Sequence, residues 1–144
     1  MRKKKSRYLA THHSGEQRKQ NPVLLRIILS EEHTQIDFGY AAPIKYVKGG
    51  WISISPDTYL QVEGLAKRYR LQDVKNIVLA PEQLEFLSTQ DWCVFTLFFD
   101  PIPIADCVIS MIEAENPTPD DFNYYGIKLS RVKEMELMAS LEIA

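Results

Sequence analysis

Apolar and polar residues alternate along much of this chain with the period of two that is typical of half-buried β-strands. In residues 34–40, TQIDFGY, apolar side chains occupy every second position and alternate with Gln35, Asp37 and Gly39. Other short segments are rich in β-branched and aromatic residues and are separated by turn-forming residues. On this basis we predict strands at residues 23–30, 34–40, 51–55, 58–62, 67–71, 74–80, 92–99, 107–113 and 122–130.

The segment WCVFTLFF, residues 92–99, differs from the others because both of its alternating faces are apolar. Val94, Thr96 and Phe98 share one face, and the threonine is the exception to the apolar pattern. A strand covered on both faces has this composition, so we predict a central strand here. A membrane-spanning helix needs about 20 apolar residues, and this run is too short to cross a bilayer.

Three further segments have other patterns. Glu63-Gly64 lies between two predicted strands and indicates a short hairpin turn. Residues 81–91 begin with a proline and fit either one helical turn or a loop. In residues 131–144 apolar side chains recur every three positions among good helix formers, which predicts a short C-terminal helix or tail.

Short strands that are separated by turns indicate an antiparallel sandwich, because alternating β–α units would require a helix between successive strands. A chain of 144 residues corresponds to one domain. We therefore predict an all-β fold with about 7–9 antiparallel strands. Residues 1–22 are predicted to be a disordered basic arm, residues 23–130 the sandwich, and residues 131–144 the C-terminal helix or tail.

Charge is distributed unevenly along the chain. The whole chain has 17 basic and 19 acidic residues, whereas residues 1–22 carry seven basic residues and Glu16 as the one acidic residue. Few apolar residues accompany these charges, which favours disorder. The arm could contact nucleic acid or an anionic surface, or serve as a solubilising tail. The residues predicted to make such contacts are Arg2, Lys3, Lys4, Lys5 and Arg7.

The acidic remainder of the chain would be repelled by nucleic acid, so any such binding is assigned to the arm. The basic start is followed by a polar stretch rather than by the apolar segment of a secretory signal. We expect a cytoplasmic location for the chain as written, and the cell envelope becomes an alternative if the chain is a fragment.

The sequence contains few groups with spacing suited to catalysis or metal binding. Cys93 and Cys107 are too few for a disulfide framework and are predicted to be free, buried thiols. His12-His13 and the acidic segment around residues 113–121 match no metal-ligand spacing. His33 is the only histidine outside the arm, and no serine lies in a nucleophile-elbow context. We therefore predict no catalytic residues, no metal site and no cofactor.

Adjacent tyrosines in FNYYGI are candidates for a recognition patch, although ordinary packing is the favoured interpretation. Tyr124 and Tyr125 must point to opposite faces of a strand, so we expect one in the core and the other at the surface. An exposed tyrosine near Trp51 would form part of a partner-binding patch. The residues assigned to this predicted patch are Trp51, Tyr124 and Tyr125.

Three segments carry a family resemblance. GGWISISPDTYL, FFDPIPIADCVISMIE and FNYYGIKL follow one another in the order seen in small immunoglobulin-like β-sandwich domains of uncharacterised bacterial proteins, which this chain resembles over roughly residues 23–130. The resemblance implies an immunoglobulin-like sandwich and an accessory or interaction domain with no catalytic residues. Such domains commonly occur in exported or lipid-anchored proteins, and the basic arm and the lack of a hydrophobic leader depart from that setting.

The sequence thus predicts a non-enzymatic module that acts through protein–protein contacts. One alternative is a nucleic-acid-associated protein that is tethered by its basic arm. Another is a carbohydrate- or calcium-dependent ligand-binding module. The sequence leaves the identity of the partner and the oligomeric state open.

Overall fold

The computed structural model describes residues 7–14, 22–41, 51–80, 82, 84–85, 92–115 and 122–131. All of the regular elements in these residues are strands, which confirms the predicted all-β class. They are β1 (Arg7–Ser14), β2 (Val23–Ser30), β3 (Thr34–Ala41), β4 (Trp51–Ile52), β5 (Tyr59–Val62), β6 (Arg68–Lys75), β7 (Leu84–Glu85), β8 (Trp92–Phe99), β9 (Cys107–Ile112) and β10 (Tyr124–Arg131).

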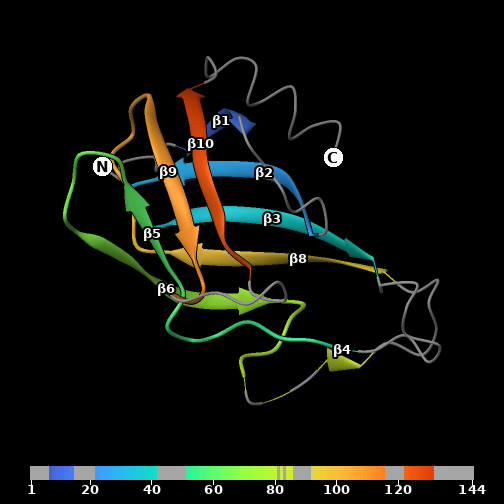
Figure 1. Ribbon diagram of the computed structural model, residues 1–144. Coiled ribbons are helices and arrows are strands. Elements are labelled where there is room, and N and C mark those ends of the chain that lie inside the picture. The colour runs from blue at the N-terminus through green and yellow to red at the C-terminus, as the bar shows by residue number, and fades with distance from the viewer. Residues whose placement is uncertain are drawn as a thin grey trace, which may run out of the picture.

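Eight of the strands form one closed barrel in the order β1-β10-β9-β5-β6-β8-β3-β2, in which every neighbouring pair is antiparallel. Strands β4 and β7 pair with each other in a separate two-stranded sheet. Figure 1 shows β5, β9 and β10 crossing in front of β2, β3 and β8. The barrel order therefore places these two groups of strands on opposite walls.

The immunoglobulin-like sandwich is not confirmed, because the eight strands belong to one closed sheet. Strand β1 makes the closure, since Ala10 is the register partner of both Arg131 in β10 and Ile27 in β2. The prediction of a disordered arm is wrong for Arg7–Ser14. These residues form a strand that pairs with β2 on one side and with β10 on the other. Without it, the backbone groups along one edge of each of these two strands would lack a strand partner. The rest of the predicted arm, residues 1–6 and 15–21, lies outside the described residues.

Alternate side chains fill the interior of the barrel. The ring of Phe38 stacks on that of Phe95 with centroids 5.3 Å apart, and Tyr124 lies 5.5 Å from Phe38. Buried aliphatic residues of the other strands, such as Ile27 and Leu60, pack with these rings in the hydrophobic core. Burial of each large apolar side chain contributes roughly 1.5–3 kcal/mol before conformational entropy is counted.

Strand β8 has the bounds that the sequence predicts and lies between β3 and β6. Its inward residues Phe95, Leu97 and Phe99 are almost completely buried. On the outer face Thr96 is also buried, but Val94 remains 42% exposed. The prediction that both faces are fully covered is therefore wrong at Val94, since only the inner face of a barrel belongs to the core.

Other boundaries agree with the sequence in part. The hairpin turn at Glu63-Gly64 is confirmed, because β5 and β6 pair on either side of it and Gly64 has φ of 88°. The strand predicted at residues 74–80 is confirmed only for Val74 and Lys75, since β6 ends at Lys75, Asn76 adopts φ of 64° and Leu79 forms only an isolated bridge with Ile54. In the region predicted as a helical turn or loop, Leu84–Glu85 form β7. Strand β10 extends to Arg131, and the predicted C-terminal helix beyond it lies outside the described residues.

The proline-containing segment after β8 carries the chain to β9, although β6 and β5 lie between these strands in the barrel. Asp100 anchors this crossing, because its N–H donates to the Arg70 carbonyl over 2.9 Å and its carboxylate accepts the Arg70 N–H over 3.1 Å. The Thr34 hydroxyl donates to the Asp100 carbonyl and accepts the Ile102 N–H, at 3.1 and 3.0 Å. This connection positions β9 beside β5 and β10. Within the described residues no helix has the length and apolarity needed to span a bilayer.

Candidate functional site

An exposed apolar surface lies on the outer face of β2, β3 and β8. Val23 and Val94 are both register partners of Gly39, so the three residues form one row across the strands. The Leu25 side chain lies over Gly39, where an added Cβ would meet Leu25 Cδ1 at 3.4 Å. Val23, Leu25 and Val94 are 49%, 48% and 42% exposed. We call Val23, Leu25, Gly39 and Val94 the apolar patch.

A bulge in β2 explains why Leu25 and Arg26 both face outward. The register of β2 against β3 shifts between Leu24 and Arg26. Leu24 is buried in the core cluster, whereas Leu25 is exposed and Arg26 bonds to Asp37 on the outer face. A bulge places an extra residue in one strand and redirects the side chains that follow. Without it, the alternation would turn Arg26 into the barrel.

A polar row adjoins the apolar patch and is held by a buried carboxylate. Arg26 Nε donates to Asp37 Oδ2 over 2.7 Å, and Thr96 Oγ1 donates to Asp37 Oδ1 over 2.6 Å. Gln35 Nε2 adds a third donor at 3.2 Å. Asp37 is 5% exposed, so these bonds satisfy a charge that would otherwise be costly to bury. The row fixes three neighbouring strands beside the patch.

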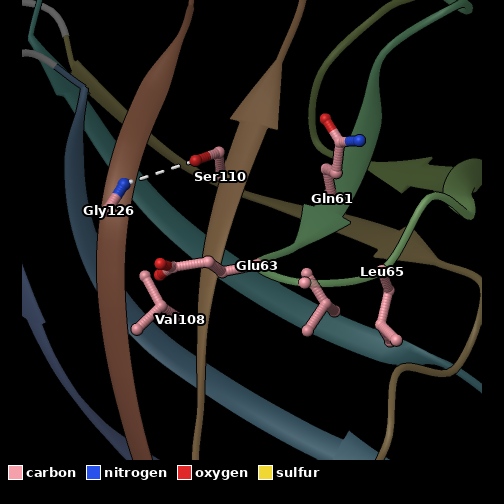
Figure 2. Close-up of a pocket in the computed structure, with 8 residues that line it drawn as sticks. Gln61, Glu63, Leu65, Val108, Ser110 and Gly126 are labelled. Carbon is pink, nitrogen blue, oxygen red and sulfur yellow. Dashed lines mark hydrogen bonds between the residues drawn. The ribbon is translucent and has the colours of Figure 1, made fainter.

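On the opposite wall, the β5–β6 hairpin, β9 and β10 line an open pocket of about 250 Å³. Figure 2 shows the Glu63 side chain extending over β9 toward β10, with Leu65 on the other side of the opening. The Glu63 N–H donates to the Val108 carbonyl over 2.8 Å, which ties the hairpin to β9. We call this site the hairpin pocket; its lining residues are Gln61, Val62, Glu63, Gly64, Leu65, Val108, Ser110 and Gly126.

The hollow of the hairpin pocket depends on an irregularity in β10. The register of β10 against β9 shifts between Tyr124 and Ile127, and Gly126 adopts φ of 63°. The Gly126 N–H donates to Ser110 Oγ over 3.3 Å (Figure 2). Apart from Gly126 itself and its two neighbours in the chain, no atom lies within 4 Å of where a Gly126 Cβ would stand. The absence of a side chain thus leaves open space on the β10 side of the pocket.

The structure separates the residues of the predicted tyrosine patch. Tyr124 is 2% exposed and donates its hydroxyl to the Pro22 carbonyl over 2.7 Å, so its assignment to a surface patch is wrong. Tyr125 is 53% exposed, which confirms that the two rings point to opposite faces. Asn123 Nδ2 donates to the Tyr125 hydroxyl over 2.7 Å. Trp51 begins β4, and its side chain lies outside the described part of the structure.

Of the basic residues predicted to contact nucleic acid or an anionic surface, the described part of the structure includes only Arg7. Arg7 is the first residue of β1 and the register partner of Ser30. The other arm residues assigned to nucleic-acid or anionic-surface contact lie outside the described residues: Arg2, Lys3, Lys4 and Lys5.

Within the acidic segment, Glu113 has a structural role. Its Oε2 accepts the Ser55 N–H and its Oε1 accepts the Phe122 N–H, each over 2.8 Å. Asn123 Oδ1 accepts the Glu113 N–H over 2.8 Å and completes this junction between β9 and β10. Over the described residues, no three metal-ligating side chains gather at one place. Asp120 and Asp121 are outside that part of the chain.

Both cysteines are free, as the sequence predicts, and both are half-buried. Burial raises the pKa of the Cys93 thiol above its ordinary value. Burial also raises the pKa of Cys107, and the negative charge of Asp106 adds to this effect. Raised pKa values lower the thiolate fraction at neutral pH.

Sequence reasoning missed the apolar patch and the hairpin pocket. The patch residues come from three strands. The sequence shows the alternation within each strand but not which strands are neighbours. Glu63 and Gly64 were recognised as a turn, but nothing local to them indicates that Val108 and Gly126 lie opposite. The chain matches no protein-family model, no curated protein and no solved structure.

Proposed function

We propose that this protein is a non-enzymatic interaction module that binds a second protein through the apolar patch. The observation that carries the proposal is the row Val23–Gly39–Val94, with Leu25 lying over its centre. Contiguous exposed apolar surface on a folded domain commonly marks an interaction site. Val23 and Val94 in this row and Leu25 above its centre form such a surface, since all three side chains are half-exposed.

The barrel architecture favours its outer surface as the place of binding. Within the described residues, the closed eight-stranded barrel offers no free strand edge to which a partner could add a strand; the short β4–β7 sheet is not part of this closure. The described inward side chains, including Phe38, Phe95 and Tyr124, fill the interior that would otherwise hold a small ligand. An outer-wall contact is compatible with both features.

The size and surroundings of the patch suit the centre of a protein interface. A stable interface buries about 800 Å² on each partner, so the patch would supply the central cluster and adjoining surface the remainder. Arg26 stands beside it with a side chain that is 36% exposed, and Asp37 fixes the guanidinium at Nε. Arginine and large apolar residues at the centre of an interface often contribute most of the binding free energy, and polar groups surround them. The held guanidinium would present its remaining N–H groups to a partner.

Substitution of the patch tests the proposal. Wild-type protein, Val94→Lys and Leu25→Lys would be immobilised and exposed to extract from the native cell, with recovered proteins quantified by mass spectrometry. Leu79→Lys is the matched control, because Leu79 is a comparably exposed aliphatic residue outside β2, β3 and β8. We expect a protein that wild type and Leu79→Lys retain and that both patch variants lose by at least about tenfold.

Two results would overturn the proposal. The first is that no recovered protein shows this dependence on the patch. The second is that purified wild type sediments as a dimer that Val94→Lys dissociates, because the patch would then be occupied by a second copy. Equal melting temperatures of the variants and wild type establish that loss of binding does not reflect unfolding.

A further inference from the structure

We propose that the hairpin pocket binds the side chain of a lysine or arginine carried by a partner polypeptide. The site lies on the wall formed by β5, β9 and β10, across the barrel from the apolar patch. The proposal therefore adds a second binding surface, which is polar and acidic where the apolar patch is aliphatic. The two proposals depend on different residues and can fail separately.

The size of the pocket favours a single side chain. Its volume of about 250 Å³ is below the roughly 300–1,000 Å³ of sites that enclose a small-molecule ligand. The opening lies on the outer surface of the strands, between the hairpin turn and the bulge of β10 (Figure 2). A side chain that projects from a partner can enter such a hollow without requiring the partner's backbone to do so.

The lining combines hydrogen-bond acceptors with apolar walls. Glu63 contributes a carboxylate, and the Gln61 amide and Ser110 hydroxyl contribute further oxygen atoms. Leu65, which is 43% exposed, and Val108 provide aliphatic contacts. In lysine and arginine, the apolar stem packs against aliphatic side chains and the charged end donates hydrogen bonds to oxygen acceptors. None of the described lining residues is basic.

The charges beside the pocket are mixed, whereas the net charge of the chain after residue 22 favours a cation. Arg68 is the register partner of the lining residue Gln61. It pairs with Glu115 at 2.5 Å and covers the Tyr59 ring at 4.4 Å, and the pair is half exposed. Lys128 and Lys67 are opposing charges. Lys128 is exposed and is the register partner of Val108, and Lys67 is exposed and follows Leu65 by two residues. Beyond these neighbours, acidic residues outnumber basic ones in the chain after residue 22, which attracts a basic partner over longer range.

Tyr125 provides a second contact for the same partner. It directly precedes Gly126 of the pocket, and its ring is 53% exposed. The hydrogen bond from Asn123 to its hydroxyl restricts the ring before any partner arrives. Tyrosine is frequent among residues that dominate binding energy, and its ring face also attracts cations. A basic side chain in the pocket would thus bring its own polypeptide against Tyr125.

A titration followed by backbone-amide NMR tests the pocket in the full chain. The probe is Nα-acetyl-lysine methylamide, and the control compound is its Nε-acetylated form, which lacks the positive charge. We expect chemical-shift changes at Glu63, Gly64, Leu65, Ser110 and Gly126 with a dissociation constant on the order of 1 mM, as for a ligand of this size. Equal shifts with the neutral compound would overturn the proposal.

Charge variants supply the decisive comparison. Glu63→Gln keeps the shape of the side chain and should weaken probe binding about two- to fivefold, the range of an exposed ion pair. Lys128→Gln should strengthen it, because a like charge is removed. Asp57→Asn is the control for net charge, since Asp57 is exposed and does not line the pocket. The proposal is overturned if Glu63→Gln weakens binding no more than Asp57→Asn.

The chain's own basic segment is a rival occupant that the same titration distinguishes. A triple variant, Lys3→Gln, Lys4→Gln and Lys5→Gln, removes three of its charges. Unchanged affinity for the probe supports a partner as the source of the side chain. Several-fold tighter probe binding by the triple variant would mean that this segment competes for the pocket, and the assignment to a partner would be wrong.

Discussion

Thr96 on β8 donates its hydroxyl to Asp37 on β3 over 2.6 Å, and the two residues are register partners in the barrel. Arg26 on β2 bonds to the same carboxylate from the other side. Because Asp37 lies between core residues Ile36 and Phe38, its side chain points to the outer face. A polar row therefore crosses three strands beside the apolar patch and holds them in register.

Removal of the Thr96 hydroxyl tests the strength of this row. Thr96→Val keeps the volume but deprives the buried Asp37 carboxylate of one donor, and we expect a loss of about 1–2 kcal/mol in the free energy of unfolding. Thr96→Ser keeps the hydroxyl and should lose less. Urea denaturation at pH 7 measures both. Equal stability of Thr96→Val and wild type would show that the bond contributes nothing.

Tyr124 links β10 to the residue before β2 through its bond to the Pro22 carbonyl. Tyr124→Phe removes the donor and leaves a buried carbonyl without it, so we expect a loss of about 1–2 kcal/mol at pH 7. Urea denaturation at that pH provides the measurement. A destabilisation below about 0.3 kcal/mol would contradict a structural role for the hydroxyl.

The same residue predicts a dependence of stability on alkaline pH. Burial, reinforced by the negative charge of Glu113, raises the pKa of Tyr124 above its ordinary value of 10.0. The folded state thus favours the neutral phenol, and the stabilisation is complete below pH about 10 and falls as pH rises further. Tyr124→Phe lacks this loss, so the stability difference between wild type and variant should shrink from pH 9 to pH 11. A constant difference would contradict the raised pKa.

Gly126 should resist substitution because of its backbone conformation. At φ of 63°, alanine is disfavoured by about 1–2 kcal/mol, although space for a Cβ is open. Gly126→Asn should cost less, since asparagine adopts this conformation more readily. Gly39→Ala is the control, because its φ is ordinary and the added Cβ meets only the exposed Leu25 side chain. Thermal unfolding of the three variants should give the largest decrease for Gly126→Ala.

The half-buried thiols should react slowly with an alkylating agent. At pH 8 we expect iodoacetamide to modify Cys93 and Cys107 more slowly than free cysteine, because both pKa values are raised. Asp106→Asn removes the charge that contributes to the raised pKa of Cys107 and should accelerate modification there but not at Cys93. Peptide mass spectrometry resolves the two sites. Equal acceleration at both sites would point to loosening of the fold instead.

Local patterns located several strands with little error. Residues 23–30 and 92–99 form β2 and β8 as predicted, since the alternation of side chains between two faces is a property of neighbouring residues. The opposite orientations of Tyr124 and Tyr125 follow from the same geometry. Which of the two tyrosines is buried depends on contacts with residues distant in sequence, such as Phe38 and Pro22.

The sequence was least informative where pairing decides the structure. RYLATHHS has charged and polar residues and no strong alternation, yet it forms β1 because β2 and β10 both have an edge to pair. The segment after Lys75 is rich in β-branched residues but leaves the strand at Asn76. In both places contacts between distant segments outweigh local propensity.

By itself the sequence determined that this protein is built from strands, where most of them run and that its two cysteines are free. Those properties follow from short-range alternation, turn chemistry and residue counts. Tertiary structure alone decided that the sheet closes, which side chains face outward, and that Val23, Leu25 and Val94 meet on one wall while Glu63 and Gly126 meet on the other. The physical reason is that strand order and bulges are selected by the free energy of the whole closed sheet, and no single segment contains that information.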